Sequence, residues 1–227
     1  MALQAQTLVK YACQIANTPG FTTQVGDFLN IILQELAQGF DWEVLRKTVL
    51  IPIGIGSNGP YSLPADYLRT QPGLFSYNVG GEQFIMTQVD LADFNQLRID
   101  NVFDYPRQFA TDTSTSPATL MIYPGSSIAV QAPLSYFSLP PDISIPASSA
   151  SVPWFLNQSY LLARLTEFAL RLANDDRADT FKMQADELLK QYLKMERDDE
   201  GYAQRVTLDA RFFRSNRNLP PTKLTVF

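Results

Sequence analysis

The chain has 227 residues, of which 45% are hydrophobic and 12% are aromatic, and its formal net charge is −5. This length and composition are enough for one sizeable hydrophobic core, or for a core and a smaller second one. The acidic balance argues against a general nucleic-acid-binding protein, because such proteins need a basic surface to neutralise phosphates. The sequence contains no histidine, which removes the commonest general base, the commonest zinc ligand and every imidazole-dependent triad.

The only cysteine, Cys13, has no partner for an internal disulfide and no second thiol for a metal site. We interpret it as a small buried residue on a helix. No apolar run approaches the roughly 18 residues that cross a bilayer, and the N-terminus lacks the pattern of a signal peptide. We therefore expect a protein of an aqueous compartment, with no cofactor, no metal and no membrane partner.

Residues 1–40 are predicted to form two helices. The first ends at Asn17–Gly20, where proline and glycine oppose helix continuation. The second begins near Thr22 and Thr23, which are expected to act as N-caps. Its apolar residues recur at helical spacing and predict one buried face, formed by Val25, Phe28, Leu29, Ile32, Leu33 and Leu36.

Residues 46–145 contain β-branched and aromatic runs separated by turn residues, a pattern typical of strands. Two of the runs flank Gly80 and Gly81, which supply the positive φ angles of a tight turn and predict a hairpin. A short helix is expected at Leu91–Leu97. The predicted strand segments are Thr48–Ile53, Leu74–Val79, Phe84–Thr87, Thr119–Tyr123 and Ile128–Phe137.

A connector rich in proline and serine follows at residues 138–152, where the prolines exclude a continuous helix or a central strand. A helix is predicted from Pro153, at a position that tolerates proline, to about Ala173. This helix is apolar around most of its circumference, so we expect it to lie at the centre of a bundle or under a neighbouring subunit. The residues assigned to this core or subunit packing are Trp154, Leu161, Leu165, Phe168 and Leu172.

The last predicted helix, residues 177–199, is amphipathic and suits antiparallel packing on the preceding helix. The predicted fold class is therefore α+β: a helical bundle with a long C-terminal helical hairpin and an inserted β-rich region resembling a sandwich or barrel. The expected parts are a helical bundle (1–45 and 153–202), a β-rich insertion (46–137), the connector (138–152) and an extended C-terminal docking arm (203–227).

Charge is distributed unevenly along the chain. Residues 61–150 hold eight acidic and three basic side chains, whereas residues 203–227 hold five basic and one acidic. A basic segment with phenylalanines and a Pro-Pro pair is typical of an extended arm that docks on a partner. The residues assigned to this arm are Arg205, Arg211, Phe212, Phe213, Arg214, Arg217 and Phe227.

The sequence offers little support for catalysis. A hydrolase with two carboxylates needs no histidine, but the acidic residues of the middle region are scattered through turn-like stretches and mark no pair. The glycine-rich stretch Gly54–Gly59 is followed by no Lys-Ser/Thr step and opens no helix, so we interpret it as a loop between strands. Trp42 and Trp154 adjoin apolar runs and are interpreted as core residues, not as a sugar-stacking platform. We predict no catalytic, cofactor-binding or metal-binding residues.

The order of several features resembles a known family. They are Phe28–Leu36, Asp41–Lys47, Tyr61–Arg69, Tyr105–Phe109 and Ile122–Pro124, followed by the connector and the two last helices. The most specific step is Leu-Pro-x-Asp-Tyr-Leu-Arg at residues 63–69. In this order the sequence is similar to the head-to-tail adaptor proteins of tailed bacteriophages, which sit as a ring beneath the portal.

The resemblance implies a structural virion protein, assembled in the host cytoplasm into a dodecameric ring that continues the DNA channel. DNA would pass without sequence-specific binding, the C-terminal arm would reach the portal protein, and the other end would hold the tail or nozzle. Two alternatives stay open: another tail or head-completion structural protein, and a carbohydrate-binding or hydrolytic tail protein.

Overall fold

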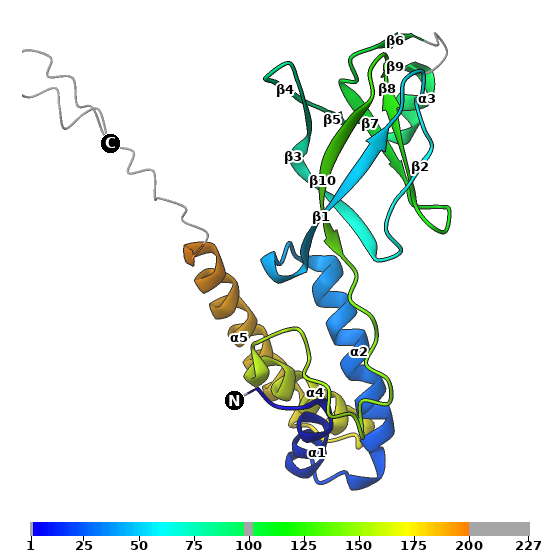
Figure 1. Cartoon of the computed structure of the whole chain (residues 1–227). Helices are drawn as coiled ribbons and strands as arrows, with labels where there is room; N and C mark the ends of the chain where they lie inside the picture. The colour runs from blue at the N-terminus through cyan, green and yellow to red at the C-terminus, as the bar shows by residue number, and fades with distance from the viewer. Residues whose placement is uncertain (1, 98–101, 200–227) are drawn as a thin grey trace, which may run out of the picture.

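The computed structural model describes residues 2–97 and 102–199, and its four long helices and its strands gather at opposite ends of the molecule, with the short helix α3 among the strands (Figure 1). Helix α2 leads from the helical end to the first strand, and a connector returns from the last strand to the helices. The α+β class predicted from the sequence is confirmed. In the described part of the chain, no helix combines the length and the apolar character that crossing a membrane requires.

The first two helices are α1, Ala5–Ile15, and α2, Thr22–Gly39, joined by a 3₁₀ turn at Pro19–Phe21. The end of the first helix is where the sequence predicted it. The predicted threonine N-caps are wrong, because Thr22 is already helical and Phe21 holds the N-cap position without a side-chain hydrogen bond. The 3₁₀ turn runs directly into α2 and leaves no residue free for a cap.

The last two helices are α4, Gln158–Leu172, and α5, Ala178–Asp199. The predicted start of α4 at Pro153 is wrong, since the chain reaches the helix only at Gln158. The Oδ1 of Asn157 accepts a hydrogen bond from the Tyr160 backbone N–H at 3.0 Å, which caps the helix. A satisfied cap defines a start more strongly than a proline that the first turn merely tolerates.

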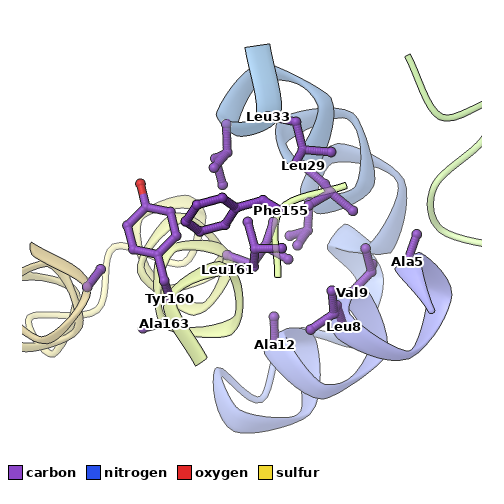
Figure 2. Packing of buried hydrophobic residues seen from close by; sticks show 14 of the residues in the cluster. Ala5, Leu8, Val9, Ala12, Leu29, Leu33, Phe155, Tyr160, Leu161 and Ala163 are labelled. Carbon is purple, nitrogen blue, oxygen red and sulfur yellow. The ribbon is translucent and has the colours of Figure 1, made fainter. Parts of the chain in front are cut away.

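The four helices enclose one hydrophobic core. Figure 2 shows Phe155 between Leu29 and Leu33 of α2 and Leu161 of α4, with Leu8 and Val9 of α1 nearby. Across the same core the rings of Phe28 and Phe168 stack with centroids 3.8 Å apart. The sequence predicted a buried face for α2, and the structure buries Val25, Leu29, Ile32, Leu33 and Leu36, with Phe28 partly buried.

The strands form two four-stranded sheets and a short pair. The first sheet has the order β1-β10-β3-β4 and the second the order β2-β8-β7-β5, while β6 pairs with β9 in parallel. The bounds of the first sheet are β1 Arg46–Ile53, β3 Tyr67–Val79, β4 Glu82–Ile85 and β10 Val130–Ser138. Those of the others are β2 Tyr61–Ser62, β5 Thr87–Gln88, β6 Phe103–Asp104, β7 Gln108–Asp112, β8 Thr119–Tyr123 and β9 Gly125–Ser126.

Most predicted strand segments are present. The hairpin is confirmed, with Val79 of β3 opposite Glu82 of β4 and both glycines between them at positive φ. Helix α3 has the predicted bounds, Leu91–Leu97. The single segment predicted at Phe84–Thr87 is wrong, because the chain changes sheets at buried Met86: Ile85 of β4 pairs with β3, whereas Thr87 of β5 pairs with β7.

A second hydrophobic core lies among the strands. Both four-stranded sheets contribute to it, and Phe75 and Phe109 meet there edge to face at 4.9 Å. Its buried members are Ile51, Ile53, Leu63, Phe75, Tyr77, Met86, Phe109, Leu120, Ile122, Ala132 and Leu134. We call residues 46–138 the β region and the α1, α2, α4 and α5 bundle the helical region. Each region therefore has its own core.

The connector lies along α2 on its way back to the helical region. Asn30 of α2 exchanges two hydrogen bonds of 3.0 Å with the backbone of Ile143. Farther along, the carbonyls of Ser149 and Ser151 accept hydrogen bonds from the first residues of α1. Residues 139–152 form no helix or strand, as the prolines predicted, but the predicted start of the connector at residue 138 is wrong, because β10 extends through Ser138.

Candidate functional site: the junction between the helices and the strands

The stretch singled out in the sequence, residues 63–69, lies where the strands meet the C-terminal end of α2. It begins just after β2, with Leu63 buried and its N–H bonded to the Ala118 carbonyl at 2.8 Å. It ends inside β3, which starts at Tyr67. The charged residues of this stretch, Asp66 and Arg69, each join several elements.

Arg69 of β3 binds the end of α2. Its Nε donates to Oδ1 of Asp41 at 2.8 Å, and Nη1 donates to the carbonyls of Ala37 and Gln38 at 3.2 and 3.0 Å. Its Nη2 donates to the carbonyl of Phe40 at 2.5 Å. One guanidinium therefore bonds four residues between positions 37 and 41, around the end of the helix.

The chemistry of a helix end explains why an arginine suits this position. The last carbonyls of a helix have no partner inside the helix and carry the negative end of its dipole. A guanidinium presents a permanent positive charge and a rigid fork of donors, and a lysine ammonium reproduces the charge but not the fork. The guanidinium of Arg69 also lies over the ring of Phe137 in β10, a cation–π contact. The side chain thus links α2, β3 and β10.

Asp66 joins the strands at the same place. Its Oδ2 accepts a hydrogen bond from Lys47 Nζ of β1 at 2.5 Å, and its Oδ1 accepts one from the Tyr136 hydroxyl of β10 at 3.0 Å. Its backbone carbonyl accepts from the N–H of Leu139, the first residue of the connector, at 2.7 Å. The sequence predicted bonds to turn amides, whereas the side-chain partners of this carboxylate come from β1 and β10.

These contacts change the acidity of the groups. Burial raises the pKa of Asp66, but the hydrogen bonds from Lys47 and Tyr136 and the charge of Lys47 outweigh burial and hold the pKa below its ordinary value. Burial, together with the Asp66 carboxylate, raises the pKa of Tyr136 to about 12. At neutral pH the Asp66 carboxylate is therefore ionised and the Tyr136 phenol keeps its proton, so the hydroxyl can donate its hydrogen bond to the carboxylate.

The entrance and exit of the β region meet beside this site. Arg46, the first residue of β1, lies opposite Phe137 near the end of β10, and the Ser138 hydroxyl donates to the Leu45 carbonyl at 3.1 Å. Just before β1, a 3₁₀ turn at Glu43–Leu45 follows Trp42, which is buried. The Nε1 of Trp42 donates to the Leu36 carbonyl at 2.7 Å, so the segment that enters the β region is fixed to α2.

The helical region contains a charged group that the sequence analysis missed. Glu167 of α4 is buried, with a side chain only 5% exposed, and it pairs with Arg164 and with Arg171 Nε at 2.9 Å. Arg171 also reaches Asp179 of α5 at 3.2 Å. A signal existed in the sequence, because Arg164 and Arg171 stand three residues before and four residues after Glu167 on the same helix face.

The residues assigned to core or subunit packing have different surroundings. Leu161 and Leu165 are fully buried, and Phe168 and Leu172 are partly buried against the same core. Trp154 precedes α4 and is partly buried, and its Nε1 is buried without a hydrogen-bonding partner in the part of the chain that the structure describes. The residues assigned to the docking arm, from Arg205 to Phe227, lie outside the described residues.

Side chains that could bind a metal do not cluster among the described residues. Residues 2–97 and 102–199 contain no group of three or more acidic or cysteine side chains placed to hold a metal ion. Cys13 is buried in α1, and burial raises the pKa of its thiol, which keeps the thiolate scarce. The two tryptophans lie in one aromatic cluster of the helical region, with ring centroids 6.3 Å apart.

No curated protein matches the chain. A family model described as SU10 adaptor protein matches residues 3–209, which include both regions and the junction between them. The chain therefore belongs to the SU10 adaptor proteins, a family of phage head-to-tail adaptors, and is a structural component of the virion.

Proposed function

We propose that copies of this protein form a closed ring, a dodecamer, that joins the portal to the tail or nozzle and continues the DNA channel. The family match over residues 3–209 carries this proposal. In this role the protein acts by position and by buried surface, without catalysis. Assembly takes place in the host cytoplasm, and DNA passes through the ring without sequence-specific contacts.

The junction supports this role because a ring repeats one subunit geometry around its axis. An error in the angle between the two parts of a subunit would be repeated in every copy and would prevent closure. Arg69 and Asp66 bind the β region to the end of α2 through hydrogen bonds in several directions. We infer that these residues set the angle at which the β region projects from the helical region.

We further propose that the basic part of the C-terminal arm docks on the portal protein. Residues 203–227 carry five basic side chains and one acidic one, with Phe212 and Phe213 between the arginines. Aromatic anchors and arginines are the side chains that most often dominate binding energy at protein interfaces, and complementary charge speeds association. The matching surface on the portal is expected to be acidic.

The acidic surface of the β region supports a place near the DNA channel. Glu82, Asp90, Asp93 and Asp104 are exposed. Residues 61–150 contain eight acidic side chains and three basic ones. A negative wall repels phosphates and keeps DNA from binding as it passes. A ring structure with all four of these carboxylates on its outer surface would refute this part of the proposal.

Electron microscopy of the purified protein mixed with its portal tests the proposed function. The expected product is a ring of adaptor density attached to one face of the portal. A chain that ends at residue 202 should fail to attach, while a variant with the exposed Met183 replaced by Ala, outside the arm, should attach normally. A protein that stays detached from portal rings under all salt conditions would contradict the proposal.

A further inference from the structure

The β region has an open side between its two larger sheets. β1 stands at one end of the first sheet and β2 at one end of the second, and residues of both strands pack on the same core. A groove of about 550 Å³ lies between them, lined by Val49–Pro52 of β1 and by Pro60–Pro64 around β2. The groove is therefore bounded by the end strands of both sheets.

The walls of this groove suit an extended apolar segment. They consist mainly of aliphatic residues and prolines, and Leu50 on β1 is 61% exposed. The hydroxyl of Tyr61 on the opposite wall is buried and has no hydrogen-bonding partner among the described residues. An end strand also presents backbone donors and acceptors that pair readily with another strand. An added strand would bring carbonyls to Tyr61 and close the open side.

The sequence beyond α5 contains a segment with the matching pattern. Thr222–Phe227, which reads Thr-Lys-Leu-Thr-Val-Phe, is rich in β-branched and aromatic residues and follows Pro220-Pro221. Leu224 and Val226 alternate with Lys223 and Thr225, so one face of such a strand would be apolar and the other largely polar. This alternation fits a strand with one face on a core.

The length of the intervening chain permits the contact. Residues 200–221 separate the end of α5 from Thr222, and 22 extended residues span up to about 70 Å. Helix α5, which has the same number of residues, is about 33 Å long. The intervening chain is therefore long enough to carry the segment well beyond the end of α5, toward the groove of its own copy or that of an adjacent copy in a ring.

We propose that Thr222–Phe227 occupies the groove as an added strand on the free side of β1, with Leu224 and Val226 facing the core. The assignment gives Phe227 a contact within the assembly and leaves the basic residues 205–217 for the portal. This assignment rests on the proposed function only where the groove belongs to an adjacent copy in the ring. The groove and the segment pattern do not depend on a portal.

Cysteine cross-linking in the full-length chain tests this pairing. In a Cys13→Ala background, Leu50→Cys on β1 is combined with Thr225→Cys, because both side chains would lie on the face of the sheet that points away from the core. The disulfide formed under mild oxidation is quantified by peptide mass spectrometry. We expect about tenfold more linked peptide than for Ile145→Cys combined with Thr225→Cys, because docking raises the local concentration of the two thiols. Ile145 is the matched control, since its side chain lies on the connector and is even more exposed, at 70%.

A second pair of variants separates docking from random collision. Leu224→Asp should reduce the linkage between positions 50 and 225 to the control level, because it would place a charge against the core. Lys223→Asp, on the other face, should leave the linkage within about twofold. Equal linkage at positions 50 and 145, or no effect of Leu224→Asp, would overturn the proposal. Portal attachment of the same variants, followed by electron microscopy, reports separately on the proposed function.

Discussion

The guanidinium carbon of Arg69 lies 5.3 Å from the centroid of the Phe137 ring, and the same guanidinium holds the carbonyls at the end of α2. A residue of β3 is thereby placed between the last strand of the β region and the helix that leads into it. The relationship makes Arg69 the side chain with the most partners at the junction.

Replacing Arg69 with Met keeps much of its apolar stem and removes every hydrogen bond of the guanidinium. We expect the free energy of unfolding to fall by about 1–3 kcal/mol, since hydrogen bonds to charged groups contribute in this range and the side chain is partly exposed. Arg69→Lys should recover less than half of the loss, because it restores charge without the fork. Urea denaturation measures both. The exposed Arg107→Met serves as the control, and an equal effect there would contradict this role.

The ion pair of Asp66 predicts a pH dependence of stability. Because the folded pKa of Asp66 lies below its ordinary value of about 3.9, the ionised carboxylate stabilises the fold above that pH, and the effect is lost as pH falls through the folded pKa. The urea midpoints of the wild type and Asp66→Asn should therefore differ at pH 7 and converge below about pH 4. In a Lys47→Met background the difference at pH 7 should shrink. A difference independent of pH in both backgrounds would refute the assignment.

Glu167 predicts a strong asymmetry between single and double substitutions. Glu167→Met leaves Arg164 partly buried without its partner and should lower the free energy of unfolding by about 3 kcal/mol. Combining Glu167→Met with Arg164→Met should cost less than Glu167→Met alone, because the unpaired charge is gone. Thermal and urea denaturation of the wild type, the two single variants Glu167→Met and Arg164→Met, and the double variant measure the coupling. Simple additivity of the two substitutions would show that the pair is not coupled.

Two glycines of the same loop provide a matched test of backbone geometry. Gly59 has φ of +95°, and a Cβ there would lie 2.8 Å from the carbonyl oxygen of Leu120, whereas a Cβ on Gly54 meets nothing within 4 Å. Gly59→Ala should lower the free energy of unfolding by about 2 kcal/mol or more, and Gly54→Ala should change it by less than about 0.5 kcal/mol. Urea denaturation compares them, and similar effects at both positions would argue against the close approach.

Local patterns predicted the elements whose stability depends on local chemistry. The end of α1, the bounds of α3 and the β3–β4 hairpin all follow from proline, glycine and apolar periodicity within a short stretch. The single strand predicted at Phe84–Thr87 failed because long-range partners decided the outcome. Ile85 pairs with β3 and Thr87 pairs with β7 of the other sheet, a change of partner that no local pattern reveals.

The same distinction applies to the junction. The sequence singled out residues 63–69 and proposed a turn role for Asp66, but not a helix-binding role for Arg69. The partners of Arg69 lie about thirty residues earlier, at the end of α2, and those of Asp66 lie on β1 and β10. Such contacts depend on how the chain folds back, and periodicity within one segment carries no information about them.

The pairing of Arg46 with Phe137 has a consequence for how such proteins can diversify. Because the chain enters and leaves the strands at neighbouring positions, everything between them can be replaced by a different module without altering the path of the helices. Recombination at this pair would exchange one set of strands for another while the helical region keeps its own core.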